Sequence, residues 1–66
     1  MSVVIKYRRY FGVKSSVVTE KYFFIESVTA DPVFIIFRYN NGESVRVYRS
    51  HLINLEIGED PETLIL

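Results

Sequence analysis

The fold of this chain is decided between residues 33 and 48, which read VFIIFRYNNGESVRVY. Residues 33–39 are apolar on both faces of an extended chain, which is typical of a central strand covered on both sides. Asn40, Asn41 and Gly42 then mark a hairpin loop, and we expect Gly42 to adopt a positive φ because glycine does so without steric cost.

The length of this loop decides which side chains share a face of the hairpin. A three-residue loop places Val45 opposite Phe37 and gathers the apolar side chains together. It also places Val47 opposite Ile35. A two-residue loop would bring Arg46 opposite Phe37 instead, so the three-residue loop is preferred.

The opposite face of the hairpin is half apolar and half cationic. An apolar patch of this kind on a small protein is a candidate interaction surface. We therefore expect a non-enzymatic protein-interaction module, a small accessory or regulatory protein that binds a protein partner. We also expect it to self-associate as a homodimer, because Phe34 and Ile36 lie opposite a face that is already filled. The candidate partner-binding residues are Phe34, Ile36, Arg38, Arg46 and Tyr48.

The rest of the chain also consists of β-favouring segments separated by turn residues. Residues 3–11 alternate between an apolar and a basic face, and residues 17–28 are long enough for a bulge to split them. Residues 53–57 form the last expected strand. Three apolar side chains of that strand are expected to point inward: Ile53, Leu55 and Ile57. We predict one all-β domain, residues 1–66, with about five antiparallel strands.

The second half of the chain has a recognisable order of elements. A central strand is followed by a hairpin, a further strand, a tight turn at Ser50-His51-Leu52 and a last short strand. This order resembles the end of an SH3-like or Sm-like small barrel, over about half the chain. The resemblance implies a small barrel. The alternative is an open, strongly curved sheet that covers its second face by pairing with another copy.

Composition excludes several kinds of site. A chain of 66 residues has room for one thin core and no cleft between domains. Without cysteine it has no disulfide, thiolate nucleophile or cysteine-ligated zinc, and its separated glycines form no phosphate-binding loop. We expect no catalytic residue, cofactor, metal site or small-molecule substrate. The one histidine, His51, is expected to be a surface or capping residue.

The charges sum to zero but are unevenly distributed along the chain, because residues 1–21 are mainly basic and residues 52–66 carry acidic side chains and no base. Arginine binds phosphates and aromatic rings stack on unpaired bases. Binding of single-stranded nucleic acid is therefore the alternative function. Its candidate residues are Lys6, Arg8, Tyr10 and Arg49. Protein binding is preferred, because the chain lacks the excess of basic over acidic residues that most nucleic-acid-binding proteins have.

The two ends of the chain give further expectations. The apolar start is interrupted by basic residues, so we expect neither a secretory signal nor a membrane segment, and a cytosolic protein without a membrane partner. Near the other end, Asp60, Pro61 and Glu62 are expected to start a short helical turn. The apolar residues Thr63–Leu66 are expected to pack on their own domain.

Overall fold

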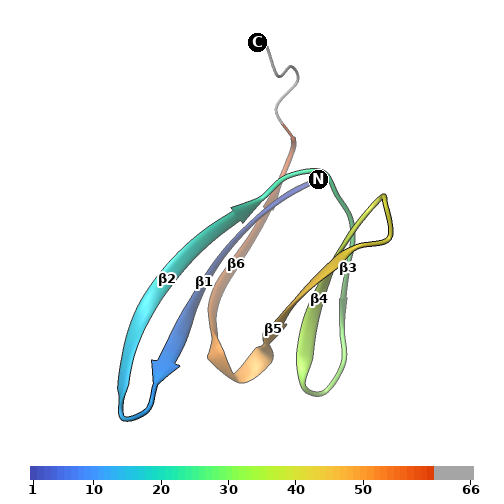
Figure 1. Ribbon diagram of the computed structural model, residues 1–66. Coiled ribbons are helices and arrows are strands. Elements are labelled where there is room, and N and C mark those ends of the chain that lie inside the picture. Colours follow the sequence, from blue (N-terminus) through green and yellow to red (C-terminus); the bar gives the residue numbers. More distant parts are fainter. Residues whose placement is uncertain (61–66) are drawn as a thin grey trace.

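Six strands form two three-stranded antiparallel sheets in the computed structural model, which describes residues 1–60 (Figure 1). The first sheet has the order β2-β1-β6, with β1 at Ser2–Phe11, β2 at Lys14–Tyr22 and β6 at Leu52–Gly58. The second has the order β3-β4-β5, with β3 at Ile25–Ala30, β4 at Phe34–Tyr39 and β5 at Ser44–Tyr48. A 3-10 turn, η1 at Arg49–His51, leads from β5 into β6. The prediction of an all-β protein is confirmed.

The number of strands exceeds the prediction because the long second strand is divided, as its length suggested. The break falls between β2 and β3, where Phe24 has a φ of 58°, an unusual conformation for a bulky residue. The Phe24 amide donates to the Asp60 carboxylate at 2.8 Å. Met1 and Ile25 also exchange two backbone hydrogen bonds of 2.8 Å. These contacts hold the bend at which the chain passes from one sheet to the other.

The hairpin between β4 and β5 has the predicted register. Phe37 lies opposite Val45, and Ile35 lies opposite Val47. Gly42 has a φ of 91°, which confirms the expected left-handed residue of the loop. The two apolar residues that the register places together on β5 therefore face the interior.

The core lies between the sheets and is small. Its five buried apolar side chains come from both sheets: Val3, Ile5, Ile25, Phe37 and Val47. Half-buried residues surround them, among them Tyr7, Tyr22 and Leu55. The twisted sheets thus meet over one thin layer, as expected for a chain of this length.

The predicted inward face of the last strand is correct at Leu55 and wrong at Ile53, which is 50% exposed, while Ile57 lies on the predicted face but is 58% exposed. The cause is a register shift in the pairing of β1 with β6, because Lys6 lies opposite Asn54 whereas Tyr7 lies opposite Leu52. Ile53 has no residue opposite it, and Leu52 packs against the core in its place. Ile57 lies opposite Val3, but β6 is an edge strand that leaves it open to solvent.

The sheets do not close into a barrel, so each has two edge strands, β2 and β6 in the first and β3 and β5 in the second. The helical turn expected at Pro61 and Glu62 and the apolar residues Thr63–Leu66 lie outside the described residues. Among residues 1–60, no helix has the length and apolar character needed to cross a membrane.

Candidate interaction surface

Four aromatic rings, each from a different element, form a continuous row in which each ring contacts the next. We call them the aromatic row, and their order in space is Tyr10, His51, Tyr48 and Phe34. The Tyr10 and His51 ring centroids are 4.7 Å apart, and those of His51 and Tyr48 are 5.1 Å apart. Tyr48 continues to Phe34 at 4.8 Å. These separations and the tilted ring planes are those that aromatic pairs favour.

The backbone explains how these rings meet. Tyr48 lies directly opposite Phe34 in the β4–β5 ladder, so their side chains share one face. The 3-10 turn that follows Tyr48 brings His51 beside it, and Tyr10 reaches His51 from the far end of β1. Tyr10 and Tyr48 are 54% and 50% exposed, so the row presents wide aromatic area to solvent.

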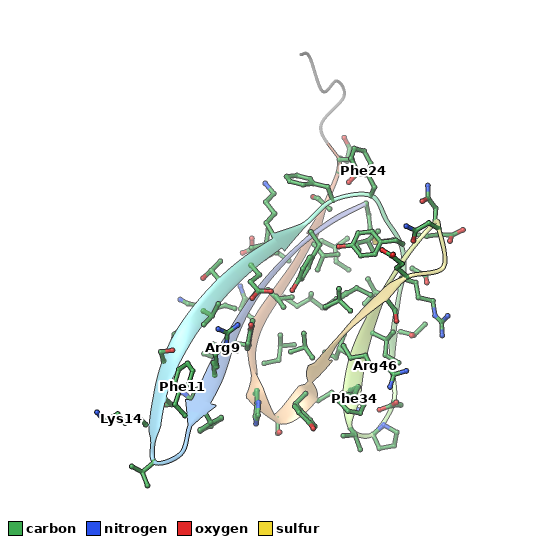
Figure 2. The ribbon with its side chains drawn as sticks, viewed as in Figure 1. Arg9, Phe11, Lys14, Phe24, Phe34 and Arg46 are labelled. Carbon is green, nitrogen blue, oxygen red and sulfur yellow. The ribbon has the colours of Figure 1, made fainter. Side chains whose placement is uncertain are left out.

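Arginine side chains surround the aromatic row. The Arg46 guanidinium carbon lies 5.9 Å from the Phe34 ring centroid, a cation–π distance, and Figure 2 shows the two side chains together. Arg49 donates to the backbone oxygen of Asp31 at 2.9 Å, and Arg8 donates to the Ser15 hydroxyl at 3.1 Å. Each of these contacts uses only part of the donor set of a guanidinium, which leaves donors for a ligand.

The folded chain separates its charges more clearly than the sequence does. The end that holds the β1–β2 turn, η1 and the start of β4 carries five of the eight basic side chains: Arg8, Arg9, Lys14, Arg46 and Arg49. The opposite end, where Met1 contacts Asp60, carries four of the eight acidic ones: Glu26, Glu43, Glu59 and Asp60. The aromatic row therefore lies at the basic end.

One acidic residue at the basic end, Asp31, is engaged by its own loop. Its carboxylate accepts the backbone N–H groups of Phe34 at 2.6 Å and Val33 at 2.8 Å. Both bonds lower the pKa of Asp31, and the bond from Phe34 has the larger effect. Asp31 thereby fixes the loop from which Phe34 enters the row.

A cleft of about 300 Å³ opens beside the row, between β2 and β5. Its lining residues come from the first sheet, from β5 and from η1: Tyr7, Glu20, Tyr22, Val45, Arg46, Val47, Tyr48 and His51. Its volume is at the lower limit of those that hold small ligands, so it suits a single side chain. The cleft combines an apolar wall with one polar cluster.

That polar cluster is centred on Glu20. The Tyr7 hydroxyl donates to Oε1 of Glu20 at 2.7 Å, and the Tyr22 hydroxyl donates to Oε2. Arg9 Nη2 lies 3.6 Å from Oε1. The hydrogen bond from Tyr22 lowers the pKa of Glu20 most, and the bond from Tyr7 lowers it further. The pKa of Tyr22 is raised, chiefly by burial and next by its bond to Glu20. Glu20 is thus held as an ionised acceptor.

The structure brings the two sets of predicted site residues partly together. Of the partner-binding set, Phe34 and Tyr48 belong to the row and Arg46 flanks it. Ile36 lies opposite Arg46 on the same face, and Arg38 lies opposite Ser44, toward the acidic end.

Of the nucleic-acid set, Tyr10 belongs to the row and Arg8 and Arg49 lie at the same end. Lys6 lies between Thr19 and Asn54 in the middle of the first sheet, outside the row. Sequence reasoning missed His51 as the link between the two sets, and it missed Glu20. No spacing could reveal either role, because the partners come from separate strands.

The chain matches no known family model, no curated protein and no solved structure. Among residues 1–60, no three His, Cys, Asp or Glu side chains are grouped to hold a metal ion. The aromatic row, the cleft and the surrounding charges are therefore the features from which a function can be inferred.

Proposed function

We propose that this chain is a non-enzymatic protein-interaction module that binds an acidic segment of a partner protein on the aromatic row. The observation that carries the proposal is the contiguous run of rings, two of them half-exposed, at the basic end of the molecule. Tyrosine and arginine are the residue types that dominate protein-binding hot spots, because they offer large rigid area together with polar groups.

A partner protein suits this surface better than a second copy does. A symmetric dimer through the row would bring Arg46 and Arg49 of both copies into one interface, and like charges gathered in an interface oppose binding. Light scattering tests this point. We expect the mass of the 7.7 kDa monomer in the absence of a partner, and a stable dimer would favour self-association instead.

Charge reversal tests the proposed surface. A fluorescein-labelled peptide that contains glutamate and valine in equal numbers serves as the probe, and its anisotropy reports binding. Arg46→Glu should weaken binding by at least about tenfold, since buried or partly buried charge pairs contribute strongly at interfaces. Arg38→Glu is the matched control, because Arg38 lies on the same face but beyond the row. Equal effects of the two variants, or no effect of either, would overturn the proposal.

Binding of single-stranded nucleic acid is the second candidate function. It is favoured by one observation, the joining of Tyr10 to Tyr48 through His51, which gives bases several rings to stack on. The test uses a labelled oligothymidine at several salt concentrations. Tyr10→Ala should weaken binding by roughly 1 to 3 kcal/mol and Arg8→Ala should flatten the salt dependence, while Lys21→Ala serves as the control. Absence of salt-sensitive binding excludes this candidate.

Two finer expectations belong to the same proposal. The order of β4, β5, η1 and β6 supports an SH3-like or Sm-like relationship, although the sheets are open. The absence of cysteine from the sequence is compatible with the expected cytosolic location.

A further inference from the structure

The outer edge of β5 offers unpaired backbone groups next to the cleft. β5 is the last strand of its sheet, with β4 on one side only. Tyr39 N–H donates to Glu43 O at 2.9 Å, and Arg49 N–H donates to Val33 O at 2.9 Å. These two bonds identify the hydrogen-bonded positions of the antiparallel ladder, which recur at every second residue.

The phase of this ladder decides which groups are free. Val45 and Val47 share the phase of Glu43 and Arg49, so their backbone groups point toward β4. The N–H and C=O groups of Ser44 and Arg46 point the other way, and no second strand among residues 1–60 pairs with β5 on that side. Such an edge is a template for an added strand.

The side chains along this edge alternate in chemistry. Val45, Arg46 and Val47 all border the cleft, but Val45 and Val47 lie on the core side of β5, whereas Arg46 lies on the opposite face beside the Phe34 ring. A strand added beside β5 would repeat this alternation, because residues opposite each other in a ladder share a face. It would place one residue near Arg46 and its two neighbours over the cleft.

We propose that the acidic partner segment binds as an additional antiparallel strand on the edge of β5. Its pattern is apolar–acidic–apolar: the acidic residue pairs with Arg46, the apolar neighbours cover Val45 and Val47, and one of these neighbours enters the cleft. The antiparallel direction is that of every ladder in the described chain. This inference rests on the proposed function and adds the conformation and sequence pattern of the partner segment.

Charge and backbone chemistry select a peptide as the occupant. Arg46 and the other cations of the basic end complement a carboxylate, and the cleft wall of Val45, Val47 and Tyr22 complements an apolar side chain. A peptide strand also supplies donors and acceptors for the β5 backbone. A nucleic acid supplies no such ladder, and a second copy would meet the cationic face described above.

The experiment uses peptides that differ in one methyl group. The parent peptide contains Val-Glu-Val, and it is compared with versions N-methylated at the glutamate or at the following valine. The residue opposite Arg46 exchanges both of its backbone bonds with β5, so methylation of the glutamate should weaken binding at least about tenfold. The following valine directs its N–H away from β5, so its methylation should change affinity by less than about threefold.

A second variant tests the cleft independently. Val45→Phe fills the space beside β5 and should weaken binding of the parent peptide by about tenfold, whereas Val33→Phe, at a 52% exposed loop position, should leave it unchanged. Circular dichroism checks that both variants fold. If Val45→Phe unfolds the chain, the two methylated peptides decide the question with the unaltered protein.

The outcomes separate the inference from the proposed function. If Arg46→Glu weakens binding but the two methylated peptides bind equally, the strand is overturned and the interaction surface stands. If Arg46→Glu has no effect, both are overturned. Displacement of the peptide by oligothymidine would also overturn the inference, because the surface would then bind nucleic acid. A protein dimer that dissociates when the peptide is added would overturn it as well, because the surface would then bind a second copy.

Discussion

Replacement of Gly42 by valine should destabilise the protein through backbone strain alone. Gly42 has a φ of 91°, and a Cβ added there meets no heavy atom within 4 Å. The cost therefore contains no steric clash with the rest of the fold. An L-residue in the left-handed region costs about 1–2 kcal/mol, and a β-branched residue lies at the upper end of that range or beyond.

Thermal and urea unfolding followed by circular dichroism measure this cost. For a domain of this size, 1 kcal/mol corresponds to about 4–8 °C in the melting temperature. We expect Gly42→Val to lower it by at least that amount, with an unchanged urea m-value. Gly42→Asn is the matched comparison and should cost less, because asparagine tolerates the left-handed conformation. An unchanged midpoint for Gly42→Val would refute the loop conformation and the register that depends on it.

Two further predictions concern the Glu20 cluster and the core. The folded-state pKa of Glu20 is lowered by its bonds to Tyr22 and Tyr7, so its stabilising contribution is present above the pKa of the unfolded carboxyl and is lost as the pH falls through the folded value. Urea unfolding of Glu20→Gln should therefore show a weaker loss of stability in acid than the parent, and an identical pH dependence would contradict the assignment. Phe37→Ala removes a fully buried ring and should cost about 3–5 kcal/mol, comparable to the whole stability of so small a domain, whereas Phe11→Ala, at a 56% exposed position, should cost little. Loss of dispersed amide signals in the NMR spectrum would report unfolding of Phe37→Ala, and a well-dispersed spectrum would show that the core is not as tightly packed as described.

Local patterns predicted the hairpin well, because its constraints lie close together in the chain. Asn40, Asn41 and Gly42 specify a loop, and the loop together with the apolar alternation around Phe37 leaves one favourable register. The same reasoning failed for β6. There the decisive feature is a register shift opposite Lys6 and Tyr7, and strict alternation along residues 53–57 contains no sign of it.

The candidate site was predictable only in parts. Tyr48 could extend the exposed face of Tyr10 only if their two strands lie close together, which the sequence leaves open. Their connection through His51 requires the 3-10 turn after β5 to approach the end of β1. The Glu20 cluster likewise requires strand pairing between Tyr7 and its neighbours on β2.

The sequence by itself determined the all-β class, the loop at Gly42 and the face of the hairpin on which Phe34, Arg46 and Tyr48 lie. Those features follow from residue type and from the two-residue period of an extended chain, which act between near neighbours. Only the tertiary structure decided that two open sheets form, that the cations gather at one end, and that a cleft lies beside the edge of β5. These depend on the bend at Phe24 and on contacts between distant strands, whose energies arise only when the whole chain has folded.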